Sequence, residues 1–299
     1  MEISLALGGG GSKGFAHLGV LRCLEKEGFK IRAVAGTSAG GIVSTLYAAG
    51  YNPDELLDRF KEFDQSRLFG RQPGDGPSLL GAAGINHLLT DLLGERTFDD
   101  LRIPCAVTAV DLRLEKEVVL KRGRVVEAVL ATIAMPGIFP PQERGDHYLI
   151  DGGLLDPVPV SPARSLRPTL PVVAVALSSI EPQPLDVLDP PVFLAQIPLL
   201  RQITRLRVAQ AFNIFIHSLE ICARYLTVMK LQSDRPDAII LPSLEDIGTL
   251  DKVDITEIAL RGEQAAAAAL TDLRSMFRFS RRLERYARIG NEKKSWIEA

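Results

Sequence analysis

The chain has 299 residues, of which 46% are apolar, and its 35 basic and 37 acidic side chains leave a formal net charge of −2. A chain of this size can bury a large core, and the balanced charge argues against nucleic acid as a main partner. Its three cysteines, Cys23, Cys105 and Cys222, stand far apart in apolar surroundings. We therefore expect buried thiols, with no disulfide framework and no zinc site.

The N-terminal residues have neither a basic start nor the apolar stretch of a secretory signal. No apolar run reaches the roughly 18 residues that a bilayer-spanning helix needs. We therefore expect a cytoplasmic protein, in which any contact with a membrane is peripheral.

Strands and helices are expected to alternate along the first half of the chain. Short apolar runs ending in glycine predict strands, and apolar residues at helical spacing predict helices. The strands are expected at residues 3–7, 33–35, 103–110 and 117–120, and the helices at 15–27, 39–49 and 52–70. We expect the strand at 117–120 to be exposed on one face, and the residues 71–84, rich in glycine and proline, to form a mobile loop.

The second half continues this alternation with longer helices. Further strands are expected at 147–150, 172–177 and 238–241, and a last helix with an alanine-rich face at 257–276. A proline-rich linker at 182–191 precedes an apolar region, 192–231, that predicts one or two long helices. The alternation indicates a mainly parallel sheet with helices on both faces, in which ligands bind at the carboxyl ends of the strands.

A candidate nucleophile, Ser38, lies between a predicted strand and a predicted helix. Gly36-Thr37-Ser38-Ala39-Gly40 matches the G-x-S-x-G pattern, in which a sharp turn exposes the serine hydroxyl at a helix N-terminus. Glycines two residues before and after the serine let strand and helix pass close together. The alternative is that Ser38 only caps the helix.

A second glycine-rich turn, Gly8 to Gly14, joins the first strand to the first helix. It contains G-x-G-x-x-G, but the second strand ends in Gly36 and not in the acid that a dinucleotide fold requires. It is no P-loop either, because Gly14 and not serine or threonine follows Lys13. An oxyanion hole, formed by adjacent glycine N–H groups, is the option that also accounts for Ser38.

The base for Ser38 is expected to be Asp151, and not histidine. Asp151-Gly152-Gly153 follows a predicted strand, where the glycines leave room for close approach. The four histidines fit a catalytic role poorly: His17 is expected to pack inside a helix, His87 lies in an apolar helical stretch, His147 stands beside Asp146 in a turn, and His217 is expected to be a core residue of the long helix.

These motifs together resemble those of the patatin-like phospholipases. The resemblance is carried by residues 9–14, 36–40 and 151–153, and by stretches similar to bacterial members at 14–21, 134–141 and 156–160. It covers residues 3–177 firmly and 235–270 more weakly. It implies a three-layer α/β/α fold with a central, mainly parallel sheet, and a single acyl hydrolase domain at 1–276 followed by a basic tail at 277–299.

The resemblance also implies roles for individual residues. Ser38 would be the nucleophile and Asp151 the base, while the N–H groups of Gly10 and Gly11, with a contribution from Ser12, would form the oxyanion hole. The motif positions that support this site are Gly9, Lys13, Gly14, Gly36, Gly40, Gly152 and Gly153. Lys13 replaces the arginine often found there and lacks its bidentate fork, and Thr132 stands where a serine is more usual.

The activity expected is hydrolysis of an acyl ester, such as a phospholipid, without metal or cofactor. Acyl transfer by the same residues and nucleotide binding by a non-catalytic regulator are the alternatives. Four alternatives remain for the apolar region 192–231: packing in the core, lining an acyl pocket, forming a homodimer face, or contacting a membrane. The basic, partly apolar tail at 277–299 predicts either contact with an anionic membrane or a solvated segment.

Overall fold

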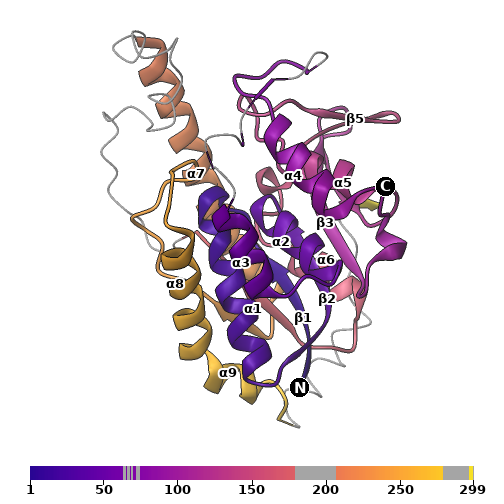
Figure 1. Cartoon of the computed structure of the whole chain (residues 1–299), viewed down its shortest axis with the longest axis vertical. Helices are drawn as coiled ribbons and strands as arrows, with labels where there is room; N and C mark the ends of the chain where they lie inside the picture. Colours follow the sequence, from indigo (N-terminus) through magenta and orange to yellow (C-terminus); the bar gives the residue numbers. More distant parts are fainter. Residues whose placement is uncertain are drawn as a thin grey trace.

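The fold is built around a mixed β-sheet that has nine strands in the part of the chain that the structure describes (Figure 1). This computed structural model describes residues 1–62, 65, 68, 70–71, 75–178, 207–278 and 296–298. The strands are β1 (Glu2–Leu7), β2 (Lys30–Thr37), β3 (Cys105–Asp111), β4 (Lys116–Leu120), β5 (Gln142–Arg144), β6 (His147–Asp151), β7 (Val172–Val175), β8 (Ala238–Ile240) and β9 (Ile297–Glu298).

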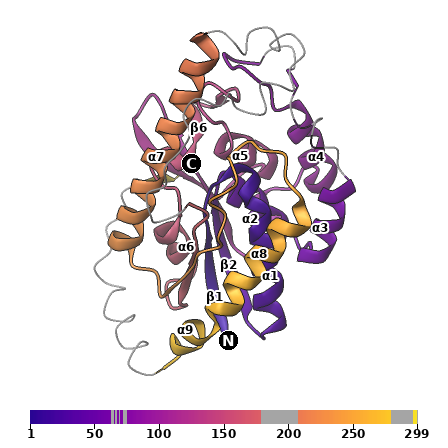
Figure 2. The ribbon, with the colours of Figure 1, turned by 90° about the vertical axis from the view of Figure 1, so that its left-hand side faces the viewer.

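The helices divide between the two faces of this sheet. They are α1 (Ala16–Lys26), α2 (Ala39–Ala48), α3 (Pro53–Glu62), α4 (Ala83–Leu93), α5 (Val125–Thr132), α6 (Val160–Leu166), α7 (Arg207–Asp234), α8 (Ile255–Ala268) and α9 (Leu270–Ser275). Figure 2 shows α6 and α7 on one side of the strands and α1, α2 and α8 on the other. The strand order is β5-β6-β3-β2-β1-β7-β8, and the five strands from β3 to β8 in this order are parallel. The three-layer α/β/α fold with a mainly parallel sheet is therefore confirmed.

The two faces of the sheet carry side chains of different size. On one face lie large residues such as Leu5 and Leu7 of β1, which pack with α1, α2 and α8. On the other face a row of alanines crosses four strands: Ala6, Ala35, Ala106 and Ala174 stand in register from strand to strand. Side chains this small let α6 approach the sheet closely, where Val160 and Ala163 complete the packing.

Two strand ends meet along β3, inside the sheet. β2 runs parallel to β3 as far as the pair Thr37–Thr108, and there it ends. β6 then takes over as the neighbour of β3 but runs in the opposite direction, and it ends at the pair Ala109–Asp151. The carboxyl ends of β2 and β6 therefore meet head to head, which places Ser38, the residue after β2, beside Asp151.

Three predicted elements differ from the structure. The helix expected at 52–70 ends at Glu62, and Gln65 beyond it exchanges hydrogen bonds with the backbone of Val253. The helix expected at 257–276 is divided by a turn at Ala269 into α8 and α9. The strand at 117–120 is not exposed on one face, because Lys230 of α7 lies 3.7 Å from the Glu117 carboxylate and covers it.

Two predicted regions are described only in part. The linker at 182–191 and residues 192–206 lie outside the described residues. The rest of the apolar region, residues 207–231, belongs to α7. Most of the basic tail also lies outside them, but Phe277 contacts the ring of Phe29, and β9 pairs with β4. No helix in the described ranges is both long and apolar enough to cross a membrane.

Candidate active site

Ser38 sits in a strained turn at the junction of β2 and α2. Its backbone has φ 53° and ψ −121°, a conformation that a residue other than glycine adopts only when the surrounding structure holds it there. A Cβ on Gly36 would lie 2.2 Å from the Gly40 carbonyl oxygen, and a Cβ on Gly40 would lie 2.1 Å from the Leu7 carbonyl oxygen, so both flanking positions require glycine. The Thr132 hydroxyl at the end of α5 accepts a hydrogen bond from the Ser38 N–H at 2.9 Å and so stabilises the backbone of this turn.

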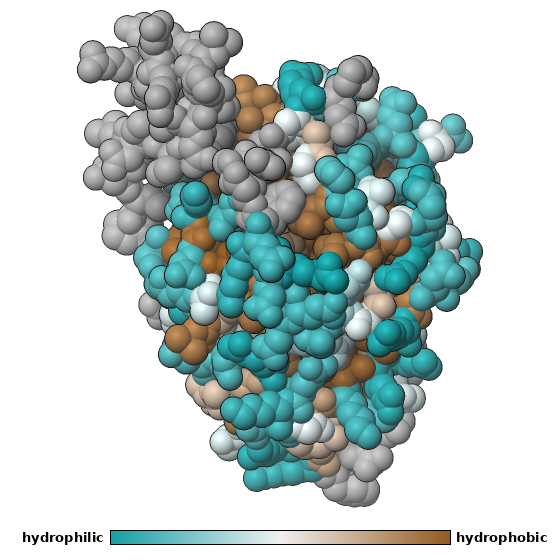
Figure 3. Space-filling view, viewed as in Figure 1, coloured by the Kyte–Doolittle hydropathy of each residue, from teal (hydrophilic) through white to brown (hydrophobic). Residues whose placement is uncertain are grey.

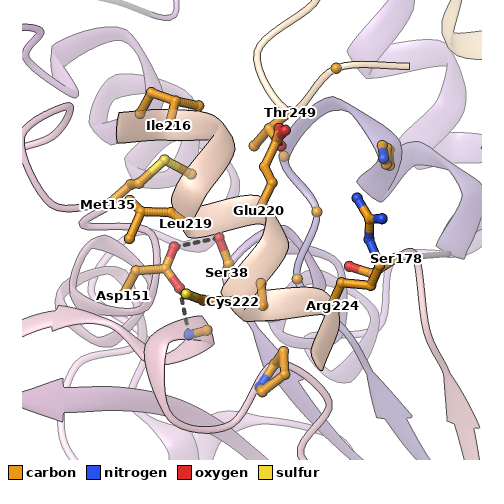
Figure 4. A pocket seen from close by; sticks show the side chains of 18 of the residues that line it. Ser38, Met135, Asp151, Ser178, Ile216, Leu219, Glu220, Cys222, Arg224 and Thr249 are labelled. Carbon is orange, nitrogen blue, oxygen red and sulfur yellow. Dashed lines mark hydrogen bonds between the residues drawn. The ribbon is translucent and has the colours of Figure 1, made fainter. Parts of the chain in front are cut away.

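The hydroxyl of Ser38 does not cap α2. No hydrogen bond runs from this side chain to the first turn of α2, and Oγ instead donates to Oδ2 of Asp151 at 2.6 Å (Figure 4). Both side chains are nearly buried, with 8% of Ser38 and 4% of Asp151 exposed. The structure therefore brings the two residues that the motifs single out into direct contact, although they lie 113 positions apart in the sequence.

Asp151 is held by its own chain as well as by Ser38. The N–H of Gly153 donates to Oδ1 at 2.7 Å, which leaves Oδ2 for the serine. Burial raises the pKa of Asp151 to about 6, and the hydrogen bonds from Ser38 and Gly153 oppose this rise. A carboxylate with such a pKa can accept a proton near neutral pH more readily than an exposed aspartate can.

The glycine-rich turn contacts this pair from the side of α1. Among the described residues, the N–H groups of Gly10 and Gly11 have no hydrogen-bond acceptor, so both are available to a ligand. Ser12 differs: its N–H donates to the Thr249 carbonyl at 2.9 Å and its hydroxyl to the Asp251 carbonyl at 2.6 Å. The expected contribution of Ser12 to the oxyanion hole is therefore not seen, because both of its donors are engaged.

Close approach of other atoms restricts side chains in this turn and at the other motif glycines. Gly11 has φ +58°, and a Cβ there would lie 1.9 Å from the Thr249 carbonyl oxygen. A Cβ on Gly9 would lie 3.2 Å from Cβ of Ser38. A side chain at the remaining motif glycines would meet atoms of the same frame: Ala39 at Gly14, Leu7 at Gly40, Thr108 at Gly152 and Asp151 at Gly153.

No histidine takes part in the Ser38–Asp151 pair. His17 is fully buried with Nε2 2.8 Å from the Gly8 carbonyl, as expected for a packing residue, and burial lowers its pKa to about 4. His147 bonds to Asp111 at 2.6 Å, and His87 lies near Asp91 on the exposed side of α4. The core position predicted for His217 is wrong, because its side chain bonds to Glu220 and lines a cavity.

Two cavities meet at Ser38. The first, of about 160 Å³, extends between α2, α3, α4 and the loop at 249–252, and we call it the apolar cavity. Its wall is mainly apolar: Phe15, Ile42, Val43, Phe60, Leu68, Ile85, Leu88, Leu89, Ile133, Met135, Phe139 and Leu250. Figure 3 shows the molecule from the same side as Figure 1. Its larger apolar patches lie in the upper half, towards the end of the molecule where α4 and α7 lie.

The second cavity, of about 400 Å³, lies under α7, and we call it the α7 cavity. Besides Ser38, Asp151 and the glycine-rich turn, its wall includes several charged or polar side chains: Lys13, His217, Glu220, Arg224, Glu245 and Asp246. Gly11, Ser38, Met135 and Thr249 line both cavities. In Figure 4, Leu219 and Cys222 of α7 lie beside Ser38 and Asp151, whereas Glu220 extends towards Thr249 and Arg224 lies beside Ser178.

The α7 cavity contains residues that the sequence did not identify. Cys23 and Cys105 are buried as expected, but Cys222 is exposed and lines this cavity, so its predicted burial is wrong. Thr249 and Glu220 were also missed, although Oε1 of Glu220 accepts from the Thr249 hydroxyl and ties α7 to the glycine-rich turn. No pattern of residues around them signals this contact.

The described residues offer no metal site: no group of three or more His, Cys, Asp or Glu side chains among them is arranged to hold an ion. Lys13, which stands where arginine is often found, lies in the wall of the α7 cavity.

Comparison with known proteins agrees with the motifs. The family described as Patatin-like phospholipase matches residues 5–164. An uncharacterised NTE family protein of Mycobacterium tuberculosis is 35% identical over 191 residues, which are 63% of this chain and 52% of the relative. Patatin-like phospholipase domain-containing protein 6 of Mus musculus is 29% identical over 171 residues, which are 55% of this chain and 13% of the relative. The chain thus spans about half the length of the mycobacterial relatives that it matches.

Two solved structures are also similar to this chain. VipD from Legionella pneumophila aligns with a TM-score of 0.49 and 14% identity, over 90% of this chain and 66% of that one. The type III effector protein ExoU aligns with a TM-score of 0.43 and 14% identity, over 89% and 52% of the two chains.

Proposed function

The chain belongs to the patatin-like phospholipase family, and from this premise we propose that it is a serine acyl hydrolase that cleaves carboxylic esters of lipids with a Ser38–Asp151 dyad. The observation that carries the proposal is the 2.6 Å hydrogen bond from Ser38 Oγ to a buried Asp151 carboxylate, at the point where two cavities meet. A nucleophile needs an adjacent base within this distance.

In the proposed reaction, Asp151 accepts the Ser38 proton as Oγ attacks the carbonyl carbon of the ester. The oxyanion that forms is stabilised by the N–H groups of Gly10 and Gly11. When the tetrahedral intermediate collapses, the alcohol leaves with the proton from Asp151. Asp151 then takes a proton from a water that attacks the acyl-enzyme, and it returns this proton to Ser38 Oγ as the second tetrahedral intermediate collapses and the acid is released.

The apolar cavity supports a lipid substrate. It opens at Ser38 and is walled by core side chains of α2, α3 and α4, so it can take an acyl chain out of water. The residues named in this mechanism all lie within 1–276, which supports one acyl hydrolase domain over that range.

The proposal is tested by Ser38→Ala and Asp151→Asn, assayed with a short-chain nitrophenyl ester. Each should lower kcat by about 10³-fold or more, since the members of such a unit act together. Unchanged melting temperatures control for folding. Turnover by either variant within tenfold of wild type would contradict the dyad.

Product analysis distinguishes hydrolysis from acyl transfer. With a lipid ester as substrate and a second alcohol added, the hydrolase should release free fatty acid as its main product. Predominant formation of the new ester would identify a transferase and contradict hydrolysis.

A further inference from the structure

The dipeptide Asp156-Pro157 bonds to all three turns of the candidate active site. The Asp156 carbonyl accepts a hydrogen bond at 2.8 Å from the hydroxyl of Thr37, the residue before the nucleophile. The Asp156 N–H donates at 2.9 Å to the carbonyl of Gly152, the residue after the base. The Pro157 carbonyl accepts at 2.9 Å from the N–H of Gly9, in the glycine-rich turn. The position of one dipeptide therefore affects the nucleophile, the base and the oxyanion donors together.

The side chain of Asp156 lines neither cavity and is fully buried. It contacts α7, which covers one face of the sheet together with α6 (Figure 2), and the Lys230 ammonium lies 3.6 Å from its carboxyl group. The carboxyl groups of Glu117 and Asp234 lie 3.7 Å and 3.9 Å from the same ammonium. Arg164 of α6 donates to backbone carbonyls at the end of α7. Three carboxyl groups with little exposure therefore surround one ammonium.

This cluster has too many acceptors unless it also holds a proton. Among the described residues, no N–H or O–H group donates to either oxygen of Asp156, and Oε1 of Glu117 also lacks a donor. Burial raises the pKa of Asp156 well above its ordinary value, and Glu117 raises it further, while burial also raises the pKa of Glu117. The two carboxyl groups are close enough for one to donate to the other. A shared proton would satisfy both and leave one negative charge on the pair to face Lys230.

We propose that Asp156 is a positioning residue whose carboxyl group shares a proton with Glu117, and that this pair fixes the dipeptide to which the three turns are bonded. The inference rests on the proposed function, because it assigns the three turns to one reaction. Asp156 acts through its neighbours and touches no reacting atom. Its loss should therefore misalign the reacting groups, which lowers kcat and leaves KM unchanged.

The first test compares Asp156→Asn with Asp156→Leu on a short-chain nitrophenyl ester. The amide keeps a donor for Glu117, so kcat should stay within about threefold of wild type. The leucine has a similar size but no donor, so kcat should fall by about tenfold with KM unchanged. Equal losses of kcat in the two variants would contradict the shared proton, and so would a change in KM alone.

Leu231→Ala is the control for a general loss of packing. Leu231 follows Lys230 in α7 and is buried against the alanine-lined face of the sheet. The variant should lower the melting temperature, because a buried side chain is truncated, but kcat should stay within about twofold of wild type. If kcat fell as far as in Asp156→Leu, destabilisation alone would explain the effect and the proposal would be overturned.

Thr37 provides a second test that does not require Asp156→Leu to fold. Thr37→Val keeps the size of the side chain but removes the hydroxyl that donates to the Asp156 carbonyl, so kcat should fall by about tenfold. Thr37→Ser keeps that hydroxyl and should retain most of the activity. The reverse order would show that packing, and not the hydrogen bond, positions the nucleophile, and it would contradict the proposal.

Infrared spectroscopy tests the shared proton itself. At pH 8 the carboxyl of Asp151, with a pKa of about 6, is ionised, but wild type should still show the C=O stretch of a protonated carboxyl group. Asp156→Asn and Glu117→Gln should each lose this band, because the carboxylate that remains then faces the Lys230 ammonium alone. A wild-type chain without the band, or a band that persists in either variant, would overturn the proposal. Failure of the dyad is visible separately, because Ser38→Ala would then retain turnover.

Discussion

The apolar cavity and the α7 cavity share one wall but are built in different ways. The apolar cavity is lined by helices that are themselves part of the core, so its surface is fixed by the packing that stabilises the fold. The α7 cavity is covered by a single helix that presents Glu220, Arg224 and Cys222 to the site. Ser38 and Gly11 line both cavities, while Asp151 and Gly10 line the α7 cavity alone, so in the proposed reaction each cavity would take a different part of the substrate.

Contacts of Lys230 near the end of α7 hold this helix against the fold, although several of its side chains are exposed. Its C-terminal half is anchored by Lys230, whose ammonium lies 3.6 Å from the Asp156 carboxylate and 3.7 Å from that of Glu117. Burial raises the pKa of Asp156, and the neighbouring Glu117 raises it further. Nearer the start of α7, Ile214 is 52% exposed. The end of α7 is therefore anchored at Lys230, and the stretch from Ile216 to Leu226 before it lines the cavity.

The largest expected effect comes from the shared wall. Gly11→Ala should lower kcat by about 10²–10³-fold for every ester, because a Cβ 1.9 Å from the Thr249 carbonyl oxygen would displace the turn that provides the oxyanion donors. Steady-state kinetics with short-chain and long-chain esters measure this, and both should lose equally.

Gly94→Ala is the matched control for Gly11→Ala. Gly94 has the same φ of +58°, but a Cβ there meets nothing within 4 Å. Backbone strain alone should cost about 1–2 kcal/mol of stability and leave kcat unchanged. If Gly94→Ala lost as much activity as Gly11→Ala, the effect would be due to strain and not to the oxyanion donors.

The pH dependence of the reaction should follow Asp151. With a pKa of about 6, the base is largely ionised at pH 7 and largely protonated at pH 5, so kcat/KM should fall about tenfold between these values. The loss should be the same for esters of different chain length. A profile that is flat from pH 5 to 7 would exclude Asp151 as the base.

Stability should depend on the same carboxyl in the opposite direction. Its folded-state pKa lies above the ordinary 3.8, so ionisation disfavours the fold. The contribution of Asp151 to stability is therefore greatest below pH 3.8 and declines as the pH rises through 6. For this reason we expect Asp151→Asn to be no less stable than wild type at pH 7.

The smallest expected effect separates the two cavities. Leu88→Trp should fill part of the apolar cavity and lower the ratio of kcat/KM for long-chain to short-chain esters by about fivefold, since each lost methylene contact has a modest cost. Leu219→Trp, on the wall of the α7 cavity, should leave that ratio unchanged. Equal ratios in the two variants would remove the assignment of the acyl chain to the apolar cavity.

The sequence singles out Ser38 and Asp151, the two residues of the proposed dyad, because their signals are local. Ser38 and Asp151 each follow a strand and stand beside glycines, and short motifs suffice to find them. That β2 and β6 meet head to head along β3 could not be predicted, because it depends on one antiparallel strand in a mainly parallel sheet. The hydrogen bond from the Ser38 N–H to Thr132 depends on the same tertiary arrangement.

Residues 207–231 form part of α7, as the predicted long helix requires, but the placement of His217 and Cys222 was wrong for a different reason. The apolar residues of α7 occur on several sides of the helix, so spacing does not show which side faces a cavity and which faces the core. His217 and Cys222 were therefore assigned to the interior, although both line the α7 cavity. The strand at 117–120 was expected to be exposed on one face for a similar reason, because Lys230, which lies against Glu117, is far away in the sequence.

The most direct test of the central claim is labelling by a fluorophosphonate probe, followed by peptide mass spectrometry. Ser38 should be covalently modified in the folded wild-type chain, and no modification should occur in Ser38→Ala. Labelling of Asp151→Asn should be slower, because the serine then lacks its base. A folded wild-type protein that remains unlabelled, or is labelled at another residue, would contradict Ser38 as the nucleophile.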